Sequence, residues 1–176
     1  MQTLQSAKPE GTVTFRKPVR EDGAAIWELI RSCKPLDENS MYCNLLQSDH
    51  FGDTCVVAEK DGEIVGWISA YVTPNDPEAV FVWQVAVSPN ARGIGLGSRM
   101  LQALMAREET ADVKRMQTTI TLDNEASWAL FRKFADKSNG DLTSDAHFTR
   151  DTHFAGEHAT EHMVTITFRE AVQSAA

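Results

Sequence analysis

The chain has 176 residues, 42% of them hydrophobic, three cysteines and a formal net charge of −8. This length supports one hydrophobic core, and the sequence shows neither a basic-then-apolar leader nor an apolar run of the roughly 20 residues that a membrane helix needs. The acidic balance disfavours nucleic acid and anionic membranes as partners and suits a small cationic substrate. Because the cysteines lack C-x-x-C spacing, we expect reduced thiols and a cytoplasmic protein.

The first part of the sequence predicts a strand at 12–17 and two helices. The first helix, at 23–33, places Ile26, Leu29 and Ile30 on one face. The second begins at Asn39 or Ser40 as its N-cap. Its apolar side chains are expected to point inward: Met41, Leu45 and Leu46. Two further strands flank Asp61-Gly62, a dipeptide typical of a tight hairpin.

The second part predicts alternating strands and helices. After a loop with Pro74 and Pro77, a strand at 80–87 leads through glycines into a helix with Met100, Leu101 and Leu104 on one face. A strand at 116–122, a helix from Asn124 and a strand at 162–168 follow. We therefore expect one α+β domain over 12–170, with a mostly antiparallel mixed sheet flanked by helices, and flexible termini at 1–11 and 171–176.

The glycine-rich stretch "VAVSPNARGIGLGSRML", from Val85 to Leu101, carries the clearest chemical signal. A strand that feeds directly into a helix leaves backbone N–H groups unpaired at the positive end of the helix dipole. Glycines let a phosphate approach this backbone, and Arg92 adds a positive charge, so a pyrophosphate is the expected ligand. The turn lacks the G-K-[ST] of a Walker A loop, and Ser98 replaces the third Rossmann glycine. The alternative is a turn that merely joins strand to helix.

The same stretch resembles a signature of the GCN5-related N-acetyltransferases, in which R/Q-x-x-G-x-G/A follows an apolar strand; Arg92, Gly95 and Gly97 match it. A second signature of that family, N-x-x-A/S-x-x-L-Y/F-x-K, is matched by "NEASWALFRK" at 124–133. The resemblance covers roughly 12–168 and implies a GNAT-type fold, with a strand, turn and helix in its middle that bind acetyl-CoA. The residues it assigns to the cofactor are Val85, Val87, Arg92, Gly93, Ile94, Gly95, Leu96, Gly97, Ser98, Asn124 and Phe131.

In this family a neutral amine attacks the thioester directly, so the site must supply a proton acceptor and a donor for the developing oxyanion. The resemblance implies the backbone N–H of Val87 as that donor. Phe131 stands where many members have an acidic tyrosine, so the thiolate, with a pKa near 8.5, leaves with the help of water alone.

Three segments, 36–51, 80–97 and 153–162, are similar to a member of the family that acetylates a small diamino acid. The resemblance implies transfer to the 4-amino group of L-2,4-diaminobutyrate, on the route to ectoine. Candidate substrate-binding residues are Asp37, Asn39, Ser40, Tyr42, Trp83, Gln84, Glu157 and His158, and candidate catalytic residues are Asp37, Tyr42, Glu161 and Val87. A cationic substrate fits these carboxylates and aromatic rings.

Simpler roles stay open for several of these residues. Asp37 and Asn39 could serve only the start of a helix, and Tyr42 has the spacing of a core residue. Strand alternation places either Trp83 or Gln84 on the cleft side of the sheet. The general base also stays open, among Asp37, His153, Glu157, His158, Glu161 and a water molecule.

Other functions are to be weighed against this one. "HATEH" at 158–162 has the H-x-x-E-H spacing of some zinc peptidases, but His158 and His162 would lie about 13 Å apart on a strand, so we expect no metal. Acetylation of another small amine and non-catalytic binding of acetyl-CoA are the remaining alternatives. A homodimer is compatible with the sequence, which does not determine the oligomeric state.

Overall fold

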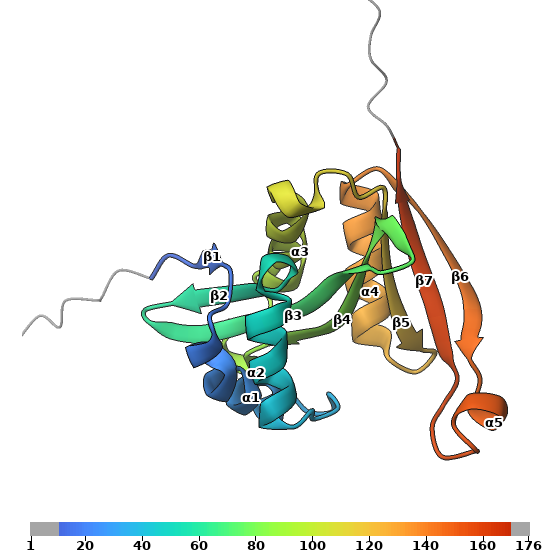
Figure 1. The fold of residues 1–176 in the computed structure, drawn as a ribbon, viewed down its shortest axis with the longest axis horizontal. Coiled ribbons are helices and arrows are strands. Elements are labelled where there is room, and N and C mark those ends of the chain that lie inside the picture. Colours follow the sequence, from blue (N-terminus) through green and yellow to red (C-terminus); the bar gives the residue numbers. More distant parts are fainter. Residues whose placement is uncertain (1–10, 170–176) are drawn as a thin grey trace, which may run out of the picture.

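The computed structural model describes residues 11–169. Apart from Gly11, the termini predicted to be flexible lie outside the described residues, and so does residue 170, the last of the predicted domain. Seven strands form one sheet in the order β1-β2-β3-β4-β5-β7-β6, in which β4 and β5 are parallel and all other neighbours are antiparallel (Figure 1). The strands are β1 (Thr14–Arg16), β2 (Val56–Lys60), β3 (Glu63–Thr73), β4 (Asp76–Val87), β5 (Arg115–Thr121), β6 (Gly140–Phe148) and β7 (Glu161–Phe168). The mixed, mostly antiparallel sheet predicted from the sequence is confirmed.

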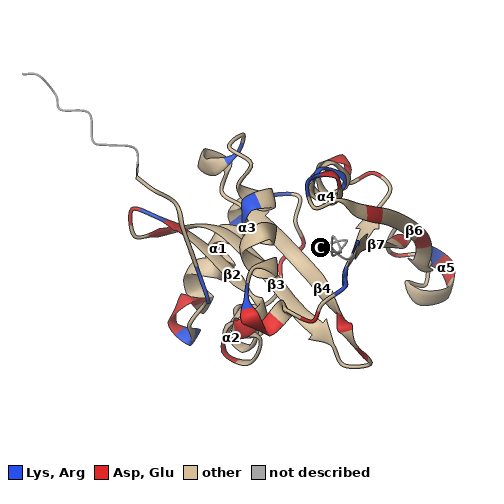
Figure 2. Cartoon of the chain, turned by 90° about the horizontal axis from the view of Figure 1, so that it is seen from above, with Lys and Arg blue, Asp and Glu red and all other residues tan. Residues whose placement is uncertain are grey.

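Helices cover both faces of the sheet. They are α1 (Gly23–Ser32), α2 (Met41–His50), α3 (Leu96–Met105), α4 (Glu125–Lys137) and the short α5 (Arg150–His153), with 3-10 turns η1 (Arg20–Asp22), η2 (Gly52–Thr54), η3 (Pro89–Ala91) and η4 (Glu108–Thr110). Seen from above, α3 and α4 lie on one side of the strands and α2 on the other (Figure 2). Among the described residues, no helix is long and apolar enough to cross a membrane.

Two hydrophobic clusters, one on each face, explain this layering. Ala58 and Ile68 pack with Met100 of α3 and Phe131 of α4, whereas Val57 and Trp67, their neighbours in sequence, pack with Ile26 and Ile30 of α1. The side chains of consecutive strand residues therefore point to opposite faces of the sheet, and both faces are buried. We call these the α3/α4 face and the α1/α2 face.

The turn predicted at Asp61-Gly62 is confirmed, with φ of +54° and +82°. The loop predicted around Pro74 and Pro77 is shorter than expected: Thr73 pairs with Asp76, and Pro77 lies inside β4. The sequence analysis also missed β6. Most of its residues are exposed, and it pairs with β7 alone at the edge of the sheet, so its sequence carries no buried apolar alternation.

The inward face predicted for α2 is wrong. Met41 is 38% exposed, and Leu45 and Leu46 are only partly buried, whereas the buried residues are Asn44, Gln47 and Ser48. Leu45 packs instead at the α1/α2 contact, where a Cβ added to Gly23 would lie 2.5 Å from its Cδ2. Helical periodicity located α2 correctly, but it does not show that a polar face is the buried one.

Candidate active site

β4 and β5 diverge and open the centre of the sheet. Among the described residues the two strands pair only where Ala79–Phe81 face Arg115–Gln117, although β4 continues to Val87 and β5 to Thr121. The Ser88 N–H donates to the Val65 carbonyl on the β3 side at 2.9 Å. Because N–H groups alternate between the two edges of a strand, those of Val85 and Val87 point to the open side. An extended polar chain can pair with these groups.

The glycine turn lies at the end of this opening. Gly93 and Gly95 have φ of +83° and +70°, and a Cβ added to either would meet no described atom within 4 Å. Gly95 is the N-cap of α3, so the first N–H groups of that ten-residue helix face open space. Arg92 and Ile94 are exposed beside them. The turn therefore has the backbone shape, space and charge of an anion site.

Three other residues assigned to the cofactor have side chains in the core. Leu96 and Ser98 are each 2% exposed, so only their backbone N–H groups face the opening. The role expected for Gly97 changes, because an added Cβ would lie 3.2 Å from Leu130 Cδ1; this glycine lets α3 approach α4. Phe131 is 3% exposed within the α3/α4-face cluster. Asn124 is exposed, and its side chain caps α4 by accepting from the Ser127 N–H at 3.1 Å.

On the α1/α2 face, polar groups from four separate segments converge. Gln84 Nε2 of β4 donates to the Asp37 carbonyl at 2.8 Å, which fixes the loop between α1 and α2. Glu161 of β7 interacts electrostatically with the Asp37 carboxylate and accepts a hydrogen bond from Thr119 of β5. His158 Nε2 lies 4.0 Å from Glu161 Oε1. The structure thus brings Asp37, Gln84, Glu161 and His158 together.

The Glu161 carboxyl group is the most unusual of these. Burial raises its pKa, and the Asp37 charge raises it further, while His158, Thr119 and His162 act in the opposite direction. Its Oε2 atom is buried without a partner among the described residues. A carboxyl group with a raised pKa and a free oxygen is suited to accept a proton or to bind an ammonium group.

Trp83 and Gln84 do not follow simple alternation. Ser69 pairs with Gln84 and Ala70 with Val82, so Trp83 is an extra residue in β4. Val82 belongs to the α3/α4-face cluster and Val85 packs against it. The two residues between them therefore point away from that face. Trp83 is 50% exposed and Gln84 8%. The prediction that only one of the pair faces the cleft side is wrong, because a bulge interrupts the strand.

The remaining predicted substrate residues lie nearer the surface. Ser40 is the N-cap of α2, accepting from the Cys43 N–H at 3.1 Å, and the Asn39 carbonyl accepts from Trp27 Nε1 at 3.0 Å. The N-cap of α2 is thus Ser40, so the helix-start alternative for Asp37 and Asn39 is wrong. Tyr42 is 68% exposed, so the core alternative for it is wrong. Glu157 is exposed in the turn before β7.

The H-x-x-E-H spacing does not form a metal site. Glu161 and His162 are consecutive strand residues and point to opposite faces, and His158 precedes the strand. Residues 11–169 contain no group of three or more side chains placed to hold a metal ion. His153 Nδ1 accepts from the Thr149 N–H at 2.9 Å, within the α5 turn.

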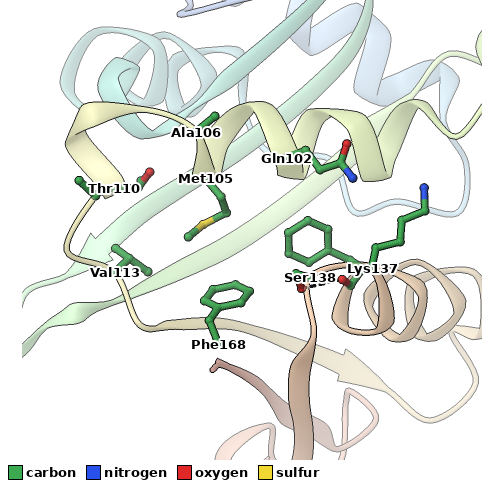
Figure 3. A pocket seen from close by; sticks show the side chains of 10 residues that line it. Gln102, Met105, Ala106, Thr110, Val113, Lys137, Ser138 and Phe168 are labelled. Atoms are coloured by element: carbon green, nitrogen blue, oxygen red, sulfur yellow. Dashed lines mark hydrogen bonds between the residues drawn. The ribbon is translucent and has the colours of Figure 1, made fainter. Parts of the chain in front are cut away.

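The sequence analysis missed Thr119. The alternation of Met116, Thr118 and Ile120, all buried, places Thr119 on the α1/α2 face and could have indicated its position beside Glu161. A separate cavity of about 410 Å³ lies at the far ends of α3 and α4 (Figure 3). Met105, Val113, Phe134 and Phe168 line it, and it shares no residue with the glycine turn or the Glu161 group.

Comparison with known proteins agrees with this geometry. The model of the acetyltransferase (GNAT) family matches residues 23–135. The L-2,4-diaminobutyric acid acetyltransferase of Vibrio cholerae is 48% identical over 165 residues, covering 93% of this chain and 95% of that protein. The protein of the same name from Halomonas elongata is 49% identical over 153 residues, covering 86% and 79%.

Solved structures of acetyltransferases are also similar to this chain. A diaminobutyrate acetyltransferase from Paenibacillus lautus, in complex with L-2,4-diaminobutyric acid and coenzyme A, is 38% identical with a TM-score of 0.85 and covers 92% of this chain and 99% of that one. The ribosomal-protein-S18-alanine N-acetyltransferase of Escherichia coli shares the fold at 13% identity, with a TM-score of 0.66, covering 94% and 99%.

Proposed function

Because the chain belongs to the GNAT family of acetyltransferases, we propose that it transfers acetyl from acetyl-CoA to the 4-amino group of L-2,4-diaminobutyrate, a step of ectoine biosynthesis. The observation that carries the proposal is the match, over nearly the full length, to diaminobutyrate acetyltransferases, one of them solved with this diamino acid and coenzyme A. The carboxyl groups of Asp37 and Glu161, close enough to influence each other, suit a substrate with two ammonium groups.

The opening between β4 and β5 fits coenzyme A. The N–H groups from Gly93 to Ser98 would hold the pyrophosphate, with the α3 dipole and Arg92 adding to the attraction. The pantetheine arm then runs along the open edge of β4 towards Gln84. Val87 lies nearest the glycine turn and would pair with a pantetheine amide.

With the pantetheine arm in this direction, the backbone N–H of Val85, rather than that of Val87, is the proposed oxyanion donor. The thioester carbonyl must lie beside the substrate amine, and the carboxylates that would hold the amine are next to Gln84. Val85 follows Gln84, and its N–H points to the open side. A fixed backbone N–H aimed at the developing negative charge stabilises the transition state.

Glu161 is proposed as the proton acceptor. The 4-ammonium group must lose a proton before it attacks, and a carboxylate with a raised pKa is a stronger base than an ordinary one. Asp37 would hold the ammonium group in place. The amine then forms the new C–N bond as the C–S bond breaks; its nitrogen gives its second proton to water, and coenzyme A leaves as a thiolate. Phe131 offers no hydroxyl to that thiolate, so water protonates it.

A thiol-release assay with acetyl-CoA and a panel of amines tests the proposal. We expect release with L-2,4-diaminobutyrate at a kcat/KM well above that with ornithine, lysine or peptides. No release with any amine would favour an acetyl-CoA-binding protein without catalysis, and a higher kcat/KM with another amine would refute the substrate.

The proposal includes the setting of the reaction. We expect a cytoplasmic enzyme that serves the response to osmotic stress, because diaminobutyrate acetylation leads to a compatible solute. The net charge of −8 supports the absence of nucleic acid and anionic membranes among its partners. Homodimer formation stays a prediction.

A further inference from the structure

The buried face of α2 is polar. Asn44 and Gln47 are 0% and 2% exposed, and Asn44 Nδ2 donates to Gln47 Oε1 at 3.1 Å. This bond leaves Asn44 Oδ1 and Gln47 Nε2 buried without partners among the described residues. Burying an unpaired polar group costs free energy that an apolar residue would not, so the two amides need an explanation.

The sheet beneath α2 carries matching groups. Ser69 of β3 and Gln84 of β4 are cross-strand partners, 1% and 8% exposed. Ser69 Oγ and Gln84 Oε1 are also buried without partners among the described residues, as is Nε1 of Trp67, two residues along β3. Trp67 belongs to the α1/α2-face cluster, and Cys55 of the same cluster lies beside the Gln47 carbonyl of α2. The orphaned groups therefore come from both sides of one helix–sheet interface.

The two ends of α2 hold it over the Ser69–Gln84 pair. Just after the helix, the Phe51 ring lies 5.9 Å from the ring of Tyr71 in β3. Tyr71 is two residues from Ser69 and on the same face of the sheet, and Ser69 pairs with Gln84. Just before the helix, the Asp37 carbonyl accepts from Gln84 Nε2. Seen from above, α2 lies on the side of the strands opposite to α3 and α4 (Figure 2).

Cys55 provides a contact between these ends. Its Sγ lies 3.9 Å from the Gln47 carbonyl and 3.6 Å from the Ala70 carbonyl, next to Ser69 in β3. The middle of α2 is therefore linked to this part of the sheet through Cys55. Asn44 and Gln47, the buried residues of this part of the helix, lie on its side turned away from solvent.

We propose that Asn44, Gln47, Ser69 and Gln84 enclose a site for one or two buried water molecules, and that Asn44 and Gln47 are thereby positioning residues for Asp37. The orphaned acceptors are Asn44 Oδ1 and Gln84 Oε1, the Gln47 amide donates, and the Ser69 hydroxyl does either. Water, which both donates and accepts, satisfies this set. A cation would leave the Gln47 amide unsatisfied and an anion would leave the two acceptors unsatisfied.

Such a water acts on the substrate loop through Gln84. By donating to Gln84 Oε1 it keeps the carboxamide oriented with Nε2 on the Asp37 carbonyl. Asp37 is then held at the position where it would bind the substrate ammonium group. This inference rests on the proposed function for the role of Asp37, but the water site itself does not.

The first test is a crystal structure of the free protein at a resolution that shows ordered water. We expect a water oxygen within about 2.7–3.2 Å of at least two of the atoms Asn44 Oδ1, Ser69 Oγ and Gln84 Oε1. Direct pairing of these groups with one another, with no water between them, would overturn the proposal. This result is independent of the substrate.

The second test is kinetic. Asn44→Leu removes the acceptor and is expected to raise the KM for L-2,4-diaminobutyrate about 10-fold, roughly the effect of one hydrogen bond, with the KM for acetyl-CoA unchanged. Asn44→Ser keeps an acceptor and should restore the wild-type KM. Thr110→Val is the matched control, since it removes a buried hydroxyl that is bonded to the Leu104 carbonyl away from the site.

The outcomes separate the two proposals. An unchanged diaminobutyrate KM in Asn44→Leu, or an equal rise in Thr110→Val, would refute the positioning role. A wild-type protein that binds the water but does not acetylate diaminobutyrate would refute the proposed function and leave the water site intact.

Discussion

Replacing Gly95 by alanine separates the role of the glycine turn in binding from its role in folding. Gly62, in the hairpin between β2 and β3, is the matched control. Gly95 and Gly62 have φ of +70° and +82°, and a Cβ added to either would meet no described atom within 4 Å. The cost of alanine therefore lies in the backbone conformation, at roughly 1–2 kcal/mol in each case. Both variants should lose about 2–8 °C in Tm.

Only the Gly95 variant should lose affinity for acetyl-CoA. Its methyl group occupies the open space at the start of α3, where the pyrophosphate would approach the N–H groups. Losing one hydrogen bond to a charged group, about 1.5–3 kcal/mol, weakens binding about 10- to 150-fold.

Titration calorimetry with acetyl-CoA, together with thermal unfolding of both variants, measures these effects. The Gly62→Ala protein should bind acetyl-CoA with the wild-type affinity. Equal affinities in the two folded variants would refute the assignment of this turn to the cofactor.

Three further predictions follow from the substrate side of the cleft. Burial raises the pKa of Glu161 in the folded protein, so the ionised carboxylate destabilises the fold as the pH rises through that pKa. Glu161→Gln should therefore raise the Tm at neutral pH, and it should lower kcat about 10²- to 10⁴-fold because the proton acceptor is lost. A lower Tm would contradict the burial argument. Turnover should survive EDTA, since the attack needs an amine, a base and backbone donors; activity lost with EDTA and restored by zinc would favour a metal role for His158 and His162. Ornithine and 2,3-diaminopropionate, one methylene longer and shorter than the proposed substrate, should each show a kcat/KM about 10- to 200-fold lower, and equal values would show that the site does not measure chain length.

The sequence was most informative where local chemistry determines structure. Gly93 and Gly95 need positive φ angles, and Asp61-Gly62 forms its hairpin turn without help from distant residues. The convergence of Asp37, Gln84 and Glu161 came from the family resemblance, since 77 residues separate the last two and no spacing rule joins them. Thr119 was predictable from strand alternation alone.

Tertiary packing decided the rest. The apolar residues of α2 predicted a buried apolar face, but the helix lies on a polar part of the sheet and buries Asn44 and Gln47. The extra residue at Trp83 is visible only in the pairing of β4 with β3. β6 is held by the edge of β7 rather than by apolar burial, so neither its composition nor its period indicates a strand.

The most direct test of the account is proton NMR of the product formed from acetyl-CoA and L-2,4-diaminobutyrate. If Asp37 and Glu161 hold the substrate so that only its side-chain amine reaches the thioester carbon, the product is N4-acetyl-L-2,4-diaminobutyrate with negligible acetylation at the 2-amino group. Acetylation chiefly at the 2-amino nitrogen would contradict the account.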